Sequence, residues 1–401
     1  MLPRLRFLTA GESHGPKLTA ILEGVPAGFP LDVKKINVDL ARRQTGFGRG
    51  GRMKMERDEV SVTSGIAAGL TTGAPIAMEL DNLDYKNWKG KAIAPMTTPR
   101  PGHADLTGAI KYGHADLRLS LERASARETA MRVCVGSVCK QLLSPFDIEI
   151  GGYVTQIGSV AISLKETTSV SEYAKRFKDA QKNEFALPDL TFNDAVHEEI
   201  KACMKAKDTL GGIFEIIALG IPPGLGSYSH WDRRLEAQIG MALLSIQAMK
   251  GVEFANAFEN ATLRGTQVHD AIFAQENGTL YRNTNRSGGF EGGITTGLPL
   301  IARVAMKPIN TTLNPIQSTN LATKKPSPTT YERSDFCAVP RAVPIGEAMV
   351  AFVLANALFE KIGGDSLKEM MPRFKLLAQN QISNFDLTNE PWFFRYEQNE
   401  S

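Results

Sequence analysis

The order of apolar and polar residues along the chain predicts pairs of short strands interleaved with long helices. Short apolar runs next to glycine or proline predict strands over residues 4–9, 18–23, 60–80 (two strands and a turn), 150–165, 211–220 and 300–306. Apolar residues spaced three and four apart predict long helices over residues 125–143, 232–250 and 346–361, and a short helix after Asp32. Because strand and helix do not alternate regularly, we expect an α+β domain built in layers rather than a Rossmann sheet.

The motifs all fall within residues 1–364, which we therefore expect to form a single domain. Residues 168–208 are polar, and we expect them to form a mostly helical, exposed excursion. The tail, residues 365–401, carries no motif that indicates a role. A glycine-rich stretch at residues 278–300 is typical of a backbone that approaches a flat or phosphate-bearing ligand, and it is equally typical of hairpin turns.

Composition is typical of a soluble globular protein. The 401 residues carry 46 basic and 43 acidic side chains, and a net charge of +3 is too small for a nucleic-acid-binding protein. No uninterrupted apolar run of about 18 residues occurs, and the N-terminus lacks the apolar run of a signal peptide, so we expect a cytoplasmic protein without a membrane partner. The four cysteines show no metal-binding spacing, so we expect no metal site and a reducing compartment.

Basic residues are concentrated in one glycine-containing segment, residues 42–57. Its charged residues are Arg42, Arg43, Arg49, Arg52, Lys54 and Arg57, opposed by Glu56. Such a segment attracts anions and could close over an anionic substrate. The alternative is a disordered, solvated loop.

A second cationic stretch, residues 99–132, combines five arginines with two histidines and two aspartates. Ser125 followed three residues later by Glu128 predicts a capping box at a helix start. A helix N-terminus suits a bound anion, and Arg123 and Arg127 flank it, so we expect a site for a phosphorylated ligand. The alternative is that these arginines form surface ion pairs with the neighbouring glutamates.

Two histidines occupy loops that could present them to a ligand. His14 lies between glycines in GESHG, residues 11–15, and His103 follows Pro101 and Gly102 in RPGHAD. Either could transfer protons, although a lone histidine is more often structural. The near-duplicate triplet at His114 lacks the preceding proline and glycine, and we expect it to be a bystander.

Eight motifs occur in an order that resembles the chorismate synthase family. They are GESHG at 11, RRQTGFGRG at 42, RPGHAD at 100, ERASARETAMRV at 122, SIQAMKG at 245, GGFEGGITTG at 288, KPINT at 307 and ERSDFCAVPRAV at 332. The resemblance implies a lyase of aromatic amino-acid biosynthesis that converts 5-enolpyruvylshikimate 3-phosphate to chorismate by 1,4-elimination of phosphate with reduced FMN. It also implies a β-α-β sandwich, with long helices layered between two antiparallel sheets, and a homotetramer.

The resemblance implies roles for individual residues. His14 would protonate the departing phosphate, His103 would stabilise the reduced flavin, and Asp335 would accept the proton passed on through flavin N5. Residues matched to FMN- or NADP-contacting positions are Arg43, Arg49, Arg123, Ala124, Ser125, Gln247, Ala248, Gly292, Lys307, Pro308, Ile309, Asn310, Thr311 and Arg333. Residues matched to substrate-binding positions are Arg43, Arg49, Arg100, Ser125, Arg127 and Arg333.

The chain departs from the family pattern in small ways, and some alternatives stay open. Asn310 stands where a proline is common, and members differ at the residue matching Leu121. Some members reduce FMN with NADPH and others depend on an external flavin reductase. Because the chain shows no added reductase domain or nicotinamide fingerprint, we expect an external source. A metal-free phosphoesterase, or a regulatory protein that binds FMN or a phosphometabolite, could use the same arginines and histidines.

Overall fold

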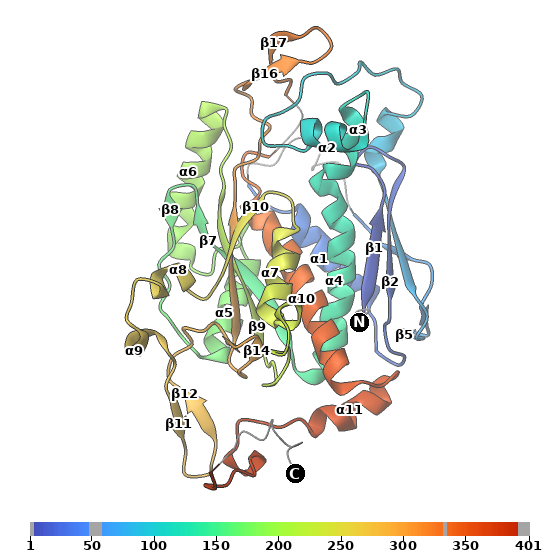
Figure 1. Ribbon diagram of the computed structural model, residues 1–401. Helices are drawn as coiled ribbons and strands as arrows, with labels where there is room; N and C mark the ends of the chain where they lie inside the picture. Colours follow the sequence, from blue (N-terminus) through green and yellow to red (C-terminus); the bar gives the residue numbers. More distant parts are fainter. Residues whose placement is uncertain (1–3, 48–57, 332–334, 392–401) are drawn as a thin grey trace, which may run out of the picture.

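The computed structural model describes residues 4–47, 58–331 and 335–391 and has a mixed α+β architecture with two main antiparallel sheets (Figure 1). One sheet has four strands, in the order β1 (Arg6–Ala10), β2 (Lys17–Glu23), β6 (Ile76–Asp81) and β3 (Ser61–Val62). The other has five, in the order β10 (Met249–Phe254), β15 (Leu300–Met306), β9 (Gly212–Leu219), β7 (Glu149–Ile157) and β8 (Val160–Ala161). The smaller hairpins are β4 (Ile66–Ala67) with β5 (Leu70–Thr71), β11 (Ile272–Ala274) with β12 (Leu280–Arg282), β13 (Phe290–Glu291) with β14 (Ile294–Thr295), and β16 (Gln317–Asn320) with β17 (Lys325–Pro328).

Long helices fill the space between the two sheets. Helix α4 (Thr129–Leu143) packs on β2 and β6 of the four-stranded sheet, and α10 (Val339–Ile362) packs on β7 and β9 of the five-stranded sheet. The two helices also pack on each other, and α1 (Val33–Gln44) contacts both. The main hydrophobic core therefore runs continuously from one sheet through the helices to the other.

Several elements confirm the predictions made from the apolar pattern. Strands occur where the runs at residues 4–9, 18–23, 211–220 and 300–306 predict them. Helix α1 begins after Asp32, whose carboxylate accepts a hydrogen bond from the Lys34 N–H. Helix α10 starts at Val339, seven residues earlier than predicted. Pro340 lies in the first turn, where proline is tolerated, and the helix also continues through Pro344.

The helix predicted over residues 232–250 is wrong at its C-terminal end. Helix α7 spans Leu235–Leu244, and the chain then turns into β10 at Met249. Ala248, in the turn that follows α7, adopts a left-handed backbone with φ of +69°, so the helix cannot extend to residue 250. Gly251 therefore lies inside a strand instead of ending a helix.

The capping box predicted at Ser125 is also wrong. A separate helix, α3 (Arg118–Ala124), precedes Ser125, whose Oγ accepts a hydrogen bond from the Arg127 N–H at 3.3 Å and caps a single 3₁₀ turn before α4. The Glu128 carboxylate turns away and accepts hydrogen bonds from Thr9, Arg132 and Gln247. Helix α4 therefore begins four residues after Ser125.

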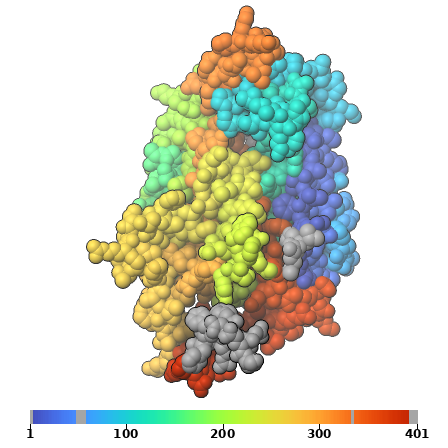
Figure 2. Space-filling view, in the orientation of Figure 1, coloured from blue at the N-terminus to red at the C-terminus, as the bar shows by residue number. Residues whose placement is uncertain are grey.

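Residues 168–208 form α5 (Val170–Gln181) and α6 (Asn193–Ala206). The segment is less exposed than we expected, because Tyr173 and Phe177 of α5 are buried against Tyr153 and Ile217 on the outer face of the five-stranded sheet. Helix α11 (Leu367–Lys375), in the tail, also packs on the core through the fully buried Met370. The β16–β17 hairpin projects beyond the rest of the molecule (Figure 2).

The remaining short helices are α2 (Asp105–Tyr112), α8 (Ala257–Asn260) and α9 (Gly265–Val268). Among the described residues, α10 is the helix long and apolar enough to cross a membrane by length and composition. However, 89% of its apolar window is buried inside the chain, as expected for a core helix.

Candidate active site

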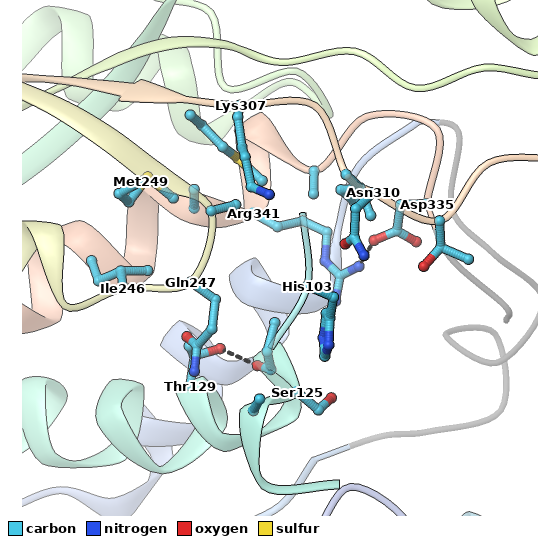
Figure 3. Close-up of a pocket in the computed structure, with 18 of the residues that line it drawn as sticks. His103, Ser125, Thr129, Ile246, Gln247, Met249, Lys307, Asn310, Asp335 and Arg341 are labelled. Atoms are coloured by element: carbon cyan, nitrogen blue, oxygen red, sulfur yellow. Dashed lines mark hydrogen bonds and ion pairs between the residues drawn. The ribbon is translucent and has the colours of Figure 1, made fainter. Parts of the chain in front are cut away.

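A cavity of about 560 Å³ opens where six segments from distant parts of the sequence meet (Figure 3). Its lining residues are Arg43, Arg100, Gly102, His103, Ala104, Ala124, Ser125, Ala126, Thr129, Ile246, Gln247, Ala248, Met249, Met306, Lys307, Ile309, Asn310, Thr311, Asp335, Ala338, Arg341, Ala342 and Ile345. Figure 3 shows His103, Asn310 and Asp335 on one side and Ile246 and Met249 on the other. The cavity therefore has a polar, charged wall facing an apolar wall.

The structure brings many of the predicted site residues into this one cavity. They are Arg43, Arg100, His103, Ala124, Ser125, Gln247, Ala248, Lys307, Ile309, Asn310, Thr311 and Asp335. A second cavity of about 630 Å³, on the outer face of the five-stranded sheet near Tyr153 and Arg303, is lined by none of the predicted residues. The first cavity is therefore the candidate site.

Other predicted residues do not line the cavity. Gly292 lies in the turn of the β13–β14 hairpin, so the glycine-rich stretch forms a hairpin here. Arg123 donates to the backbone oxygens of Thr9 and Gly11 and ties α3 to the first sheet. Pro308, His14 and Arg127 are also absent from the lining. Arg49 and Arg333 lie outside the described residues.

On the charged wall, Arg100 and His103 share one carboxylate. Asp105, the first residue of α2, is fully buried and accepts from Arg100 Nε at 2.8 Å and from His103 Nδ1 at 2.6 Å. Burial raises the pKa of Asp105, but the hydrogen bonds from Arg100 and His103 outweigh burial and hold that pKa well below its ordinary value. Arg100 also donates to Thr311 Oγ1 at 3.3 Å, which links the loop to the segment after β15.

Two predicted substrate residues share Asp58: Arg43, which lines the cavity, and Arg127, which does not. Arg127 Nη1 lies 2.7 Å from Asp58 Oδ2, and its Nε donates to Asn82 Oδ1 at 2.9 Å. Arg43 Nη1 lies 3.7 Å from the same Asp58 oxygen, and its Nε donates to Thr129 Oγ1 at 3.0 Å. Of these two arginines, the structure therefore places Arg43 at the cavity and Arg127 in a buried ion pair.

Asp335 pairs with Arg341, an arginine that the sequence analysis missed. Arg341 Nη1 contacts Asp335 Oδ2, and Arg341 Nε donates to the backbone oxygen of Arg43 at 2.9 Å. Arg341 lies in the first turn of α10, in the apolar motif CAVPRAVPIGEA, and a single charge among apolar helix residues was the available signal. It adds a cation to the cavity wall.

Lys307 closes another part of the charged wall. Its Nζ donates to the Gly102 backbone oxygen at 2.5 Å, next to His103. Partial burial lowers the pKa of Lys307, and the positive charge of Lys250 lowers it further. The end of β15 and the loop before α2 are therefore joined directly at the cavity.

His14 lies outside the cavity lining but is connected to it. Ser13 Oγ is 3.2 Å from Ser125 Oγ, and Ser125 lines the cavity. The His14 Nδ1 is 2.7 Å from Glu122 Oε1, and the ring packs on Trp88 with centroids 4.3 Å apart. His14 therefore has a fixed orientation in a loop that touches the cavity wall.

Neither a metal site nor the second histidine triplet contributes to the cavity. No group of three or more histidine, cysteine, aspartate or glutamate side chains within residues 4–47, 58–331 and 335–391 could hold a metal ion. His114 packs on Tyr112 and is absent from the cavity lining.

Comparison with known proteins identifies the family. The chorismate synthase family model matches residues 5–359. The chorismate synthase of Desulforamulus reducens is 50% identical over 384 residues, covering 94% of this chain and 98% of that protein, and the one of Aquifex aeolicus is 49% identical, covering 95% and 99%. A solved structure described as a crystal structure of chorismate synthase matches with a TM-score of 0.78 and 42% identity, covering 94% of this chain and 97% of the other. This chain therefore belongs to the chorismate synthase family.

Proposed function

We propose that the cavity lined by Arg100, His103 and Asp335 is the active site of a chorismate synthase. Family membership makes the chain a carbon–oxygen lyase of the shikimate pathway, which converts 5-enolpyruvylshikimate 3-phosphate to chorismate and phosphate. The observation that carries the assignment of the site is the meeting of these three side chains, from residues 100, 103 and 335, around one cavity of suitable size.

The charges around the cavity match the substrate, which carries a phosphate and two carboxylates. Arg43, Arg100, Arg341 and Lys307 all line the cavity. Arginine forms charge-assisted, bidentate contacts with carboxylate and phosphate groups, so these side chains are well suited to bind the substrate. We propose that Arg49 and Arg333, outside the described residues, add to this set.

The remaining wall suits a flavin. Ile246, Met249 and Ile345 offer an apolar surface to a flat ring system. Two buried polar atoms of lining residues, Gln247 Oε1 and Asn310 Nδ2, have no hydrogen-bond partner among the described residues, so one acceptor and one donor are available to a ligand with both N–H and C=O edges. When bound, reduced FMN supplies electron density as the phosphate leaves and then recovers it.

We propose three proton-handling residues. His14 gives a proton to the oxygen of the departing phosphate, and Asp335 receives the proton removed from the substrate carbon. His103 holds a proton beside the flavin ring. The ion pair between Asp335 and Arg341 keeps the carboxylate at the cavity wall in the ligand-free chain. A general acid or base contributes about 10²- to 10⁴-fold to the rate, which sets the effect expected for each residue.

The broader setting is also part of the proposal. We propose that the layers form the β-α-β sandwich that the family resemblance implies, and that residues 1–364 make up a single domain, on whose core α11 of the tail packs. We propose a cytoplasmic homotetramer that receives reduced FMN from an external flavin reductase instead of reducing it with NADPH.

An anaerobic assay tests the proposed function. The purified chain is given 5-enolpyruvylshikimate 3-phosphate with and without reduced FMN, while chorismate absorbance and released phosphate are followed. The proposal predicts equal amounts of chorismate and phosphate, and only with reduced FMN. Phosphate without chorismate would show a phosphoesterase, and ligand binding without turnover would show a regulatory protein; either result contradicts the proposal.

A further inference from the structure

We infer that Asp105 is a positioning residue that holds His103 and Arg100 together at the cavity. The inference rests on the proposed function, in which Asp105 has no role so far. Asp105 is fully buried at the start of α2, whereas His103 and Arg100 both line the cavity. Asp105 therefore acts from behind the wall and reaches the ligand through its two neighbours.

Both oxygens of Asp105 are engaged by Arg100 and His103. Oδ2 accepts from Arg100 Nε at 2.8 Å and from the Arg100 backbone N–H at 3.1 Å. Oδ1 accepts from Arg100 Nη2 at 3.0 Å and lies 2.6 Å from His103 Nδ1. Arg100 is held in a bidentate pair, the geometry that most restricts a guanidinium group.

The contact with Asp105 also determines which nitrogen of His103 faces a ligand. An ionised carboxylate only accepts hydrogen bonds, so the 2.6 Å contact requires a hydrogen on Nδ1 of His103. Arg100 Nη2 lies 3.0 Å from the same Nδ1, and the shorter contact with Asp105 decides the assignment. Nε2 is then the His103 nitrogen that can exchange a proton in the cavity.

The chain contains a natural comparison, because His-Ala-Asp occurs twice after a glycine. In the second copy, Asp116 accepts hydrogen bonds from the backbone N–H of Met96 at 3.0 Å and of Arg118 at 2.8 Å. His114 Nδ1 instead lies 2.9 Å from Ser120 Oγ. The second aspartate therefore holds a loop and not its histidine.

Position relative to the helices explains the difference between the two copies. In the first, α2 begins at Asp105 itself, and Gly102, with φ of +78°, turns the chain so that His103 and Asp105 meet. In the second, Gly113 ends α2 in a left-handed conformation, and Asp116 comes before α3. The same three residues therefore produce a histidine–carboxylate pair only at the helix start.

Asp105→Asn tests the inference, with Asp116→Asn as the matched control. Asparagine keeps the size but has a single acceptor oxygen, so it can no longer accept from both Arg100 Nε and His103 Nδ1. In the anaerobic assay with reduced FMN, Asp105→Asn should lower kcat by about 10- to 100-fold, part of what a general acid or base contributes. Asp116→Asn should leave kcat within about two-fold of the wild type, because Asp116 contacts no cavity residue.

A double-mutant cycle separates positioning from a purely structural role. If Asp105 acts through His103, adding Asp105→Asn to His103→Asn should change kcat by less than about three-fold, because the group it positions is already gone. If Asp105 also positions Arg100, Asp105→Asn should raise KM for the substrate in the wild-type chain. The same substitution should not raise KM further in a chain that already carries Arg100→Lys. If Asp105→Asn lowers kcat equally in the wild-type chain and in the His103→Asn chain, its effect is structural, and the inference is overturned.

Further variants distinguish a loss of folding, a failure of the inference and a failure of the proposed function. If Asp105→Asn does not fold, Asp105→Glu keeps the charge but displaces it, and the inference predicts a folded protein with reduced kcat. Wild-type kcat in a folded Asp105→Asn or Asp105→Glu variant would overturn the inference alone. A wild-type chain that forms no chorismate would overturn the proposed function as well.

Discussion

Arg341 shows how one side chain joins two parts of the cavity wall. It pairs with Asp335 and donates to the backbone oxygen of Arg43, so it links the start of α10 to the end of α1. A single arginine in an apolar helix start carried no indication of these contacts in the sequence. The position of Arg341 at the cavity follows from the structure and not from the sequence.

Replacing Arg341 should weaken catalysis. Arg341→Gln loses a charge-assisted contact worth about 1.5–3 kcal/mol, so kcat/KM should fall by about 10- to 100-fold. Steady-state assays with reduced FMN measure the effect, and Arg6→Gln is the control because Arg6 forms an exposed pair with Glu23. Unchanged kcat/KM in Arg341→Gln would exclude a role for the Asp335–Arg341 pair.

His14 provides a separate test at the residue scale. His14→Ala should lower kcat by about 10²- to 10⁴-fold if the ring protonates the departing phosphate. His230→Ala is the matched control, because His230 forms an exposed pair with Asp232 at 2.8 Å through the same Nδ1 atom. Turnover at the wild-type rate in His14→Ala would refute the assignment.

Arg127 shows what residue patterns alone cannot predict. The sequence left two roles open for Arg127: binding a phosphorylated ligand, or a surface ion pair with a neighbouring glutamate. In the structure it is buried and pairs with Asp58, 69 residues earlier in the chain. Residue types indicated an anion site, but the partner of each arginine depends on packing between distant segments.

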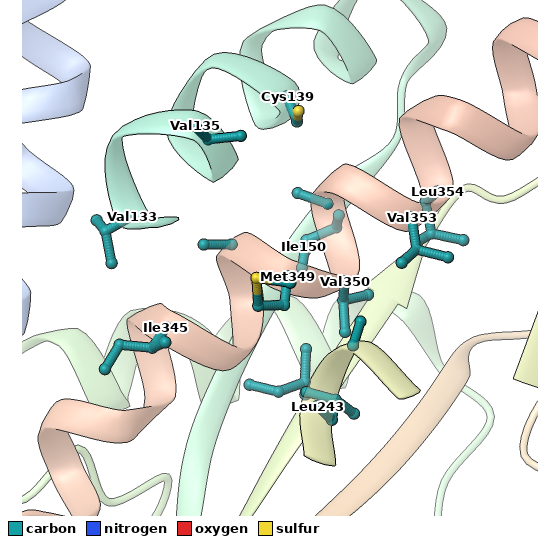
Figure 4. Packing of buried hydrophobic residues seen from close by; sticks show 14 of the residues in the cluster. Val133, Val135, Cys139, Ile150, Leu243, Ile345, Met349, Val350, Val353 and Leu354 are labelled. Atoms are coloured by element: carbon teal, nitrogen blue, oxygen red, sulfur yellow. The ribbon is translucent and has the colours of Figure 1, made fainter. Parts of the chain in front are cut away.

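At the scale of elements, α4 and α10 approach closely because small residues line their contact. A Cβ on Gly136 would lie 2.1 Å from the Cβ of Ala348, so no larger residue fits there. Figure 4 shows Val133 and Val135 of α4 and Ile345 and Met349 of α10 among the buried side chains around this contact. The small residues Ala130, Gly136 and Ser137 in α4 allow close packing, but the sequence does not indicate which helix is the partner.

Two glycine substitutions should have opposite effects. Gly136→Ala forces α4 and α10 apart and should destabilise the protein by about 1–3 kcal/mol. Gly240→Ala, in α7, meets nothing within 4 Å and should stabilise by up to about 1 kcal/mol through helix propensity. Urea unfolding measures both, and equal stability of the two variants would contradict the packing described.

A buried charge cluster links three helices next to the cavity. Glu347 of α10 is fully buried, and its carboxylate accepts from Arg42 of α1 at 2.7 Å and from Lys140 of α4 at 2.5 Å. Glu347→Gln removes the buried charge of the cluster and leaves Asp39 as the carboxylate that Arg42 and Lys140 still share. It should therefore cost at most about 3–5 kcal/mol in urea unfolding. Glu198→Gln, in an exposed pair with Lys201, should leave the unfolding midpoint unchanged.

The same carboxylate predicts a pH dependence. Burial raises the pKa of Glu347, but the charges of Arg42 and Lys140 lower it more, to about 2 from an ordinary 4.5. Since the folded pKa is depressed, the ionised carboxylate contributes stability above pH 4.5 and loses that contribution as the pH falls toward 2. The stability difference between wild type and Glu347→Gln should therefore shrink over this range. A constant difference would mean that the folded pKa is not depressed.

The turn before β10 was the main error at this scale. Ile246 and Met249 continue the helical spacing of α7, so the apolar pattern predicted a helix through residue 250. The positive φ of Ala248 instead presents Gln247 and Ala248 to the cavity. The family resemblance indicated these two residues even though the predicted element was wrong.

For the whole molecule, the layered α+β class was predictable but the arrangement of strands was not. The five-stranded sheet joins β10, β15, β9, β7 and β8, which come from residues 149–306 and do not follow chain order. Strand order depends on which apolar faces pack on α4 and α10, and local periodicity holds no information about it. The motifs indicated that a site exists. They could not indicate its shape, because the cavity is lined by segments that only the packing of the layers brings together.

The most direct test is a crystal structure of the chain with oxidised FMN and 5-enolpyruvylshikimate 3-phosphate. The account predicts both ligands in the cavity of about 560 Å³, with the substrate near Arg100 and Asp335 and the flavin against Ile246 and Met249. Ligands in the outer cavity near Tyr153 and Arg303, with this cavity empty, would contradict it.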